Sequence, residues 1–533
     1  MARAGRAPSW PARLAGWAWA AACGVVVWAG FPPVGAWWAV PLGLAGIMAA
    51  TRQATWGQAG LRGLFLGLGL FTPLLHFTAV SMGNPLGWVS LTLVESLYLV
   101  AWAIAWSLVS RVPVLKGDGW RALVGRVLAV TVLWCGAEEL RSSWPWGGFP
   151  FGRLAFAMAD APVLPVAAYG GSVGLSLLVA LVAACVAEAV RAGARLRVLH
   201  AVAAGAGAGA LLLAPVALPV DSSSQDGTIR VGAVQGDVAD SARAADDVFA
   251  RALEVTGNHA QATLDMASEV EAGSLDLVVW PENAADLDPR THSSAAVLVE
   301  HAAQQVRAPL LVGAVAYEGQ VRHNDVIVWV PGQGAGEVYR KHRPVPFGEY
   351  VPWREALRRV TSQVDRIGTD MAAGDGPTSL TVHAAARDRD VTVAMGICFE
   401  VAYDDVLRQG VTEGGEAIVI PTNNASFGRS SEAAQQLAQG RVQAVVHGRS
   451  VVQVSTVGLT AVISPKGVVE QELEPFTRSW LVADVGLRQT VTLADRLGPW
   501  PGRVVLAGAT VLVLTGILCR AHEGLRRRRR RRR

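Results

Sequence analysis

Eight apolar stretches constrain what this chain of 533 residues can fold into, seven of them within the first 220 positions and one near the C-terminus. A membrane hydrocarbon core about 30 Å thick is crossed by roughly 20 apolar residues in a helix. The second stretch is short and contains Pro41, yet we expect all eight to span a membrane. Their ranges are 14–31, 36–51, 61–80, 87–110, 122–140, 162–190, 198–219 and 504–519.

Basic residues in the short loops predict how these spans are oriented. Arginine and lysine gather before the first span and in alternate loops, near residues 52–62, 111–121 and 191–197, whereas the loops around 32–35 and 81–86 contain none. Cytoplasmic loops are enriched in such residues. We therefore expect both termini in the cytoplasm and the segment between spans seven and eight outside it. A cleaved leader ending near Cys23 would remove one span and break this alternation.

Charge divides the chain at about residue 221. Residues 221–499 contain 36 acidic and 23 basic side chains, net −13, and the remainder contains 7 and 24, net +17. We expect a transmembrane domain at 1–220, a soluble catalytic domain at 221–499, a last span at 500–519 and a cytoplasmic tail at 520–533. The eight arginines that end the tail favour anionic lipid. They leave room for a cytoplasmic partner, but without aromatic neighbours they do not indicate nucleic-acid binding.

The hydrophobic period changes after Pro219, where strand-like runs begin to alternate with amphipathic segments. This alternation predicts one α/β layered domain with functional side chains at the ends of strands. We expect strands at 229–234, 275–280, 309–315, 325–329, 379–383, 391–397, 417–421, 450–454 and 460–464, and helices at 239–271, 292–306, 402–411 and 431–447.

Three residues that follow apolar runs carry useful chemistry. Glu282 is either a structural anchor or a base with a raised pKa, because a carboxylate that ends a buried strand needs a partner. Lys341, one of only three lysines in the chain, stands among arginines, which suggests that a compact ammonium is needed there. Cys398 alone fits a buried small hydrophobe. Together the three supply a base, a cation and a nucleophile.

The sequence predicts neither a metal site nor a disulfide framework. The five cysteines lack the spacing of a zinc site or of a disulfide framework, and the ten histidines form no metal-binding pattern. No Ser/His/Asp arrangement is evident either. We expect neither a metal nor a cofactor.

Three motifs carry a resemblance to a known family. Trp280-Pro281-Glu282, the run from Lys341 through Pro346-Phe347-Gly348-Glu349-Tyr350, and Ile397-Cys398-Phe399-Glu400 resemble the Glu-Lys-Cys signatures of the nitrilase, or carbon-nitrogen hydrolase, superfamily. The second motif, with spans before and after the domain, resembles the apolipoprotein N-acyltransferase family in its actinobacterial form.

This resemblance implies an αββα sandwich outside the cytoplasm, with Glu282 as base, Lys341 as stabiliser and Cys398 as nucleophile. It places Glu349 and Glu400 as supporting acids, and Phe399 and Tyr350 beside the substrate. Phe399 stands where the family usually has Tyr. The run Asn423-Asn424-Ala425-Ser426-Phe427 also departs from the family's Asn-Asp-Ala-Trp-Phe pattern.

The implied activity moves an acyl chain from a membrane phospholipid, through a cysteine thioester, to the α-amino group of a diacylated apolipoprotein at the bacterial cell membrane. Two other classes stay open. One is a membrane-tethered amidase or nitrilase that hydrolyses a small amide or nitrile. The other is a non-enzymatic lipid-binding scaffold or transporter, which charges inside the spans would favour. Apart from Glu95, the spans contain almost no such charges except near their ends.

Overall fold

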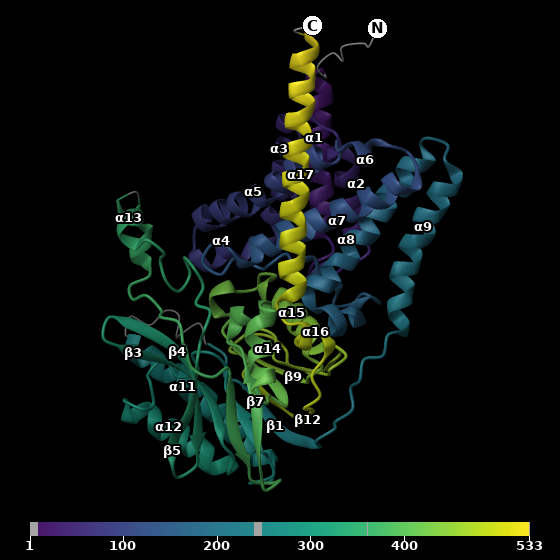
Figure 1. The fold of residues 1–533 in the computed structure, drawn as a ribbon. Coiled ribbons are helices and arrows are strands. Elements are labelled where there is room, and N and C mark those ends of the chain that lie inside the picture. Colours follow the sequence, from purple (N-terminus) through teal and green to yellow (C-terminus); the bar gives the residue numbers. More distant parts are fainter. Residues whose placement is uncertain (1–8, 239–247, 360, 532–533) are drawn as a thin grey trace. The chain divides into compact units, whose positions relative to one another are not determined.

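The computed structural model describes residues 9–238, 248–359 and 361–531 (Figure 1). The chain forms two compact units. One comprises Met1–Leu218 together with Pro499–Arg533, and the other comprises Pro219–Gly498. We call them the helical unit and the sandwich unit.

The helical unit contains one long helix at each of the eight predicted stretches. Four of these helices are long and apolar enough to cross a membrane, over Pro85–Val109, Leu164–Gly193, Val198–Ala217 and Trp500–Arg526. The full set is α1 (Trp10–Trp28), α2 (Ala39–Thr51), α3 (Trp56–Leu74), α5 (Pro85–Val109), α7 (Trp120–Ser143), α8 (Ala167–Gly193), α9 (Val198–Leu213) and α17 (Trp500–Arg531), with short helices α4 (Phe77–Met82) and α6 (Pro113–Lys116) between them.

Small residues allow helices α1 and α3 to pack with their backbones in contact. A Cβ added at Gly24 would lie 2.2 Å from the Leu66 carbonyl oxygen, and one added at Gly69 would lie 2.2 Å from the Ala21 carbonyl oxygen. Packing of this kind is typical of helices in lipid, where close van der Waals contact replaces the hydrophobic effect.

Glu95, the charge that the sequence places inside a span, has a structural partner. Its carboxylate accepts a hydrogen bond of 2.8 Å from Arg141, and both side chains are buried. Arg141 also donates to the carbonyl oxygens of Phe149 and Phe151. Pairing explains how a carboxylate is tolerated there, and the pair anchors the loop after α7.

The sandwich unit is built from two six-stranded sheets. The first has the order β12-β1-β2-β3-β4-β5 and the second the order β11-β10-β9-β8-β7-β6. The strands of the first are β1 (Thr228–Gln235), β2 (Leu277–Val279), β3 (Leu310–Glu318), β4 (Val321–Val330), β5 (Gly334–Arg340) and β12 (Ser479–Gly486). Those of the second are β6 (Ser379–Ala384), β7 (Arg389–Met395), β8 (Ala417–Thr422), β9 (Val451–Ser455), β10 (Ala461–Ile463) and β11 (Val469–Glu472).

Alternating side chains fix the layer order. Val231, Val279 and Leu311 of the first sheet pack against Val393 and Val419 of the second, which makes the central core. The intervening residues face outward, toward α11 (Val248–Glu269) and α12 (Ser293–Val306) on the first sheet, and toward α14 (Asp404–Thr412) and α15 (Glu432–His447) on the second (Figure 1). The unit is thus the predicted αββα sandwich.

All nine predicted strands are present, but three further strands were missed: β5, β11 and β12. The four predicted helices correspond to α11, α12, α14 and α15. Residues 239–247 of the first predicted helix lie outside the described residues. Two short helices, α13 (Arg354–Arg358) and α16 (Leu493–Leu497), were not predicted either.

Candidate active site

Three sequence-predicted residues meet at one edge of the sandwich because each follows the carboxyl end of a strand. Glu282 lies three residues after β2, Lys341 directly follows β5, and Cys398 lies three residues after β7. Strands β2 and β3 are parallel, and β5 is antiparallel to β4, which is antiparallel to β3, so β5 runs in the direction of β2. Functional groups in α/β folds gather at such strand ends.

Lys341 is fully buried between two carboxylates. Its Nζ donates to Oε1 of Glu349 at 2.7 Å and to Oε1 of Glu282 at 3.2 Å. The other oxygen of Glu349 accepts from the backbone N–H of Val345 at 2.7 Å. One ammonium therefore contacts two carboxylates. The two oxygens of Glu349 also connect its loop to the site, since one binds Lys341 and the other binds the backbone N–H of Val345.

Burial and neighbouring charges affect the pKa values of Glu282 and Lys341 in different ways. Burial raises the pKa of Glu282, against the opposing charge of Lys341. For Lys341, burial acts to lower the pKa, but the negative charges of Glu282 and Glu349 outweigh it and hold the pKa well above its ordinary value. Lys341 thus stays an ammonium at neutral pH, while Glu282 binds a proton more readily than an exposed glutamate.

Cys398 begins a short 3-10 turn, Cys398–Ala402, with a φ of +53°. Left-handed backbone at a residue other than glycine costs free energy and is concentrated at functional sites. The side chain is partly exposed. Burial and the charge of Glu282 raise the pKa of its thiol, whereas Lys341 and a hydrogen bond with Thr422 act to lower it. The resting thiol is therefore protonated, and a nearby base is needed to make it a nucleophile.

Glu400 is a structural anchor of the turn that contains the cysteine. Its carboxylate is fully buried and accepts four hydrogen bonds: from the backbone N–H groups of Ile397 (2.7 Å), His342 (2.7 Å) and Arg343 (2.8 Å), and from the hydroxyl of Tyr339 (2.6 Å). These bonds join the cysteine turn to the segment that follows Lys341.

The two predicted substrate-side aromatic residues differ in setting. Phe399 is buried, and its ring packs edge-to-face with Tyr403 at a centroid distance of 5.3 Å. Tyr350 is half-buried, and its carbonyl oxygen accepts from the N–H of Phe347 at 2.8 Å, which closes the loop that contains Glu349.

Two asparagines that the sequence analysis did not assign to the site complete the surroundings of Glu282. Asn324 of β4 donates to Oε1 of Glu282 at 2.5 Å, and the backbone N–H of Asn423 donates to Oε2 at 2.9 Å. Asn423 follows β8, so the strand-end pattern could have identified it. No sequence signal identifies Asn324, which lies directly before the predicted strand at 325–329 and within β4 of the structure.

Behind the cysteine, a buried polar network connects β8 to α15. Thr422 donates to Oε1 of Gln436 at 2.9 Å, and Asn424 donates to the same oxygen at 2.9 Å and to Glu432 at 2.6 Å. Ser455 in turn donates to the Asn424 side-chain oxygen at 2.6 Å. Glu432 is buried without a cationic partner among the described residues, and burial raises its pKa to about 8.

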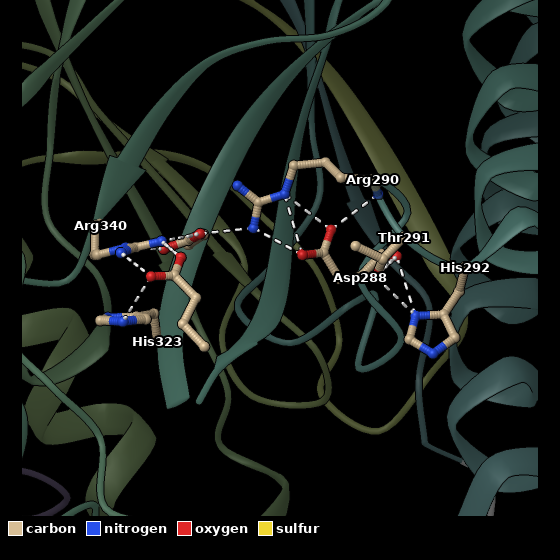
Figure 2. Close-up of polar contacts among 8 residues, drawn as sticks. Asp288, Arg290, Thr291, His292, His323 and Arg340 are labelled. Carbon is tan, nitrogen blue, oxygen red and sulfur yellow. Dashed lines mark hydrogen bonds and ion pairs between the residues drawn. The ribbon is translucent and has the colours of Figure 1, made fainter. Parts of the chain in front are cut away.

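A separate ion-pair network holds the strands that carry Asn324 and Lys341 (Figure 2). Fully buried Asp325 accepts from Arg290 at 2.7 Å and from Arg340 at 2.9 Å. Arg340 also donates to Glu318 at 2.6 Å, and Arg290 to Asp288 at 2.9 Å. Because Asp325 and Arg340 are register partners in β4 and β5, the network fixes the strand ends next to the site.

Within the described residues, no group of three or more histidine, cysteine or acidic side chains is placed to hold a metal ion. The cluster around Cys398 instead has the parts of a nucleophilic site: a partly exposed thiol, a carboxylate with a raised pKa and a buried ammonium.

The two-sheet sandwich and this site define a nitrilase-like carbon-nitrogen hydrolase unit. The family model "Carbon-nitrogen hydrolase" matches residues 230–495, and the model "Apolipoprotein N-acyltransferase N-terminal domain" matches residues 23–185. The apolipoprotein N-acyltransferase of Mycolicibacterium smegmatis is 32% identical over 518 residues, which is 92% of this chain and 83% of that protein. The chain therefore belongs to the apolipoprotein N-acyltransferase family.

A second relative agrees with that assignment. The apolipoprotein N-acyltransferase of Azotobacter vinelandii is 29% identical over 527 residues, 96% of each chain. Among solved structures, an amidase from Nesterenkonia sp. matches with 14% identity and a TM-score of 0.36, covering 49% of this chain and 92% of its own.

Proposed function

We propose that this protein is an apolipoprotein N-acyltransferase that moves an acyl chain from a membrane phospholipid to the α-amino group of a diacylglyceryl-modified N-terminal cysteine. The observation that carries the proposal is the meeting of Glu282, Lys341 and Cys398 at one edge of the sandwich. Family membership supplies the substrates. It also favours acyl transfer over hydrolysis of a small amide or nitrile.

In the first half-reaction, Glu282 takes the proton of the Cys398 thiol and the thiolate attacks the ester carbonyl of the phospholipid. Lys341 and the backbone N–H of Phe399 stabilise the negative oxygen of the tetrahedral intermediate. When the intermediate collapses, Glu282 returns the proton to the departing alkoxide. The products are a lysophospholipid and an acyl thioester on Cys398.

In the second half-reaction, the α-amino group of the lipoprotein attacks the thioester carbonyl. Glu282 accepts a proton from the attacking amine, the C–S bond breaks, and the amide forms. The proton on Glu282 then restores the thiol of Cys398. A carboxylate whose pKa is raised by burial suits this work, since it must accept and release a proton in both halves.

Supporting residues act through the three central ones. Glu349 holds the Lys341 ammonium in place with a 2.7 Å hydrogen bond. Glu400 fixes the turn that presents Cys398, through four hydrogen bonds. Tyr350 and Phe399 contribute to the surface on which the substrates lie. The reaction uses neither a metal nor a cofactor.

Both substrates are lipids, and this matches the domain arrangement that we propose: transmembrane residues 1–220, catalytic residues 221–499, a last span at 500–519 and a cytoplasmic tail at 520–533. Eight spans place the catalytic domain on the outer side of the bacterial cell membrane and both termini in the cytoplasm. The alternation of basic loops supports this topology. A cytoplasmic partner at the arginine tail stays a prediction.

Mass spectrometry of lipoprotein N-termini tests the function directly. The full-length protein, supplied with phospholipid and a diacylated lipoprotein, should yield the N-acylated product, and a thioester-linked acyl group should appear on Cys398 when the acceptor is omitted. Cys398→Ala and Cys398→Ser should lose both signals while keeping the thermal unfolding midpoint of the parent. Acylation by the alanine variant would overturn the proposal. Release of ammonia from small amides without phospholipid would favour the amidase.

A further inference from the structure

A second charged cluster lies in the helical unit, where α2 and α8 end and α7 begins. A cavity of about 130 Å³ opens between these helices and the end of α5. Its floor includes the buried side chains of Met48 and Trp106, and its charged lining consists of Arg52, Arg126, Glu188 and Arg191. A water molecule occupies about 30 Å³ in the liquid, so the cavity has room for a group several times the volume of one water molecule.

The acidic side chain of the lining is already fully engaged. Arg126 donates to both oxygens of Glu188, at 2.8 and 2.6 Å, and Arg191 donates to Oε2 of Glu188 at 2.9 Å. Arg191 also contacts Asp118, which lies outside the cavity lining and is shared with Arg195. The lining thus contains three guanidinium groups and one carboxylate, a formal net charge of +2, of which Asp118 outside the lining offsets a part through Arg191.

Arg52 supplies the uncompensated charge. In the part of the chain that the structure describes, no hydrogen bond or ion pair involves its guanidinium, and its Nε is buried without a partner. A partly buried cation without a hydrogen-bond partner is costly, and an anion that enters the cavity relieves this cost. Guanidinium groups match phosphate oxygens through paired hydrogen bonds.

The rim of the cavity indicates which kind of phosphate enters. Ala49 of the lining is exposed, and Leu42, seven residues earlier on α2, is 51% exposed. Residues seven apart lie on one face of a helix. An apolar strip therefore runs from the charged cavity along the outer surface of α2, as a phosphate attached to acyl chains requires.

We propose that this cavity binds the phosphate group of an anionic phospholipid, with Arg52 as its main partner and the acyl chains lying along α2. Basic pockets between membrane helices bind such headgroups at the cytoplasmic face, where the proposed topology places these helix ends. The site shares no residue with the cluster around Cys398. It goes beyond the proposed function, since the lipid bound here is retained and is not the acyl donor.

Phosphatidylglycerol binding to the full-length protein in detergent tests this site. Native mass spectrometry and the thermal unfolding midpoint should both report retention by the parent protein. Arg52→Gln should weaken the apparent affinity about tenfold or more, because one charge-assisted contact is lost. Arg121→Gln removes an exposed arginine at the start of α7 that is not part of the lining, and should bind like the parent.

Three results would overturn the proposal: unchanged phosphatidylglycerol binding by Arg52→Gln, equal retention of neutral phosphatidylcholine, or equal stabilisation by inorganic phosphate at the same concentration. The last would assign the cavity to a soluble anion. Arg52 has no partner in the described residues, so its replacement should not harm folding. If the glutamine variant fails to fold, Arg52→Lys keeps the charge without the planar fork and should bind with intermediate affinity.

Discussion

Arg340 and Lys341 are neighbours in sequence, yet their charges serve different ends. Arg340 lies in the ion-pair network with Asp325 and Glu318, whereas Lys341 lies between Glu282 and Glu349. Hydrogen bonding to Arg340 holds the pKa of Glu318 below its ordinary value, but burial raises the pKa of Glu282. One network holds its carboxylates in fixed positions. The other keeps a carboxylate that binds a proton more readily than an exposed glutamate.

This contrast shows that the kind and number of cations around a carboxylate decide its role. Asp325 receives two guanidinium groups, so its charge is saturated and its work is structural. Glu282 receives one ammonium that it shares with Glu349, so its charge is only partly balanced. Neutral donors, Asn324 and the Asn423 N–H, fill its remaining positions without adding charge.

Exchanging the cations at positions 340 and 341 should give the largest difference in activity between the two networks. Lys341→Arg should lower the acylation rate by about 10²- to 10³-fold, because a planar fork cannot take the place of the ammonium beside the developing oxyanion. Rates are measured with a fluorescent phospholipid donor and a diacylated peptide. Arg340→Lys is the matched control and should keep most of the activity per folded molecule. Parent-like rates for Lys341→Arg would remove Lys341 from the chemistry.

The structural network should respond in stability instead of activity. Asp325→Asn should lower the free energy of unfolding by about 3 kcal/mol, because it removes one side of a buried ion pair and leaves two guanidinium groups undercompensated. Chemical denaturation of the full-length protein measures this. Asp405→Asn, which breaks an exposed pair with Arg343, should cost about 1 kcal/mol or less. Equal losses in the two variants would contradict the structural role of Asp325.

Glu349→Gln tests whether the shared ammonium depends on both carboxylates, because it removes one of the two negative charges next to Lys341. The pKa of Lys341 should fall, since Glu349 is one of the charges that raise it. We expect a rate roughly 10-fold lower at neutral pH, and an alkaline limb of the pH–rate profile that moves to lower pH. The profile is measured alongside that of the parent. A lower rate with an unmoved alkaline limb would show that Glu349 acts only on loop structure.

The sequence predicted the central residues better than their surroundings because the strand-end pattern is local. Glu282 and Cys398 each follow an apolar run, whereas Lys341 stood out as one of only three lysines in the chain. The strands that were missed all lie at sheet edges. Two of them have weak patterns: β11 reads Val469-Glu470-Gln471-Glu472, and β5 contains two glycines and is partly exposed. Their pairing is decided by tertiary contacts, which local propensity does not encode.

Contacts between residues distant in sequence could not be predicted, for the same reason. Asn324 reaches Glu282 from 42 residues away, and it lies within a strand where nothing distinguishes it. The buried asparagine–glutamate pair, Asn424 with Glu432, joins a strand end to a helix start and depends on the packing of α15. Glu400 was predicted as a supporting acid through resemblance, but the four hydrogen bonds that define its role come only from the fold.

Glu432 should give an effect on stability that depends on pH. Its folded-state pKa of about 8 lies above the ordinary value of 4.5 for a glutamate, so the folded protein binds the proton more tightly. Stability from this group is therefore fully present below about pH 4.5 and is lost as the pH rises toward 8. Glu432→Gln, which cannot ionise, should flatten the fall in unfolding midpoint between pH 5.5 and 8. If the unfolding midpoints of the variant and the parent fall in parallel with pH, Glu432 is already ionised in the folded state. The buried network behind Cys398 would then contain a negative charge, as Glu282 does.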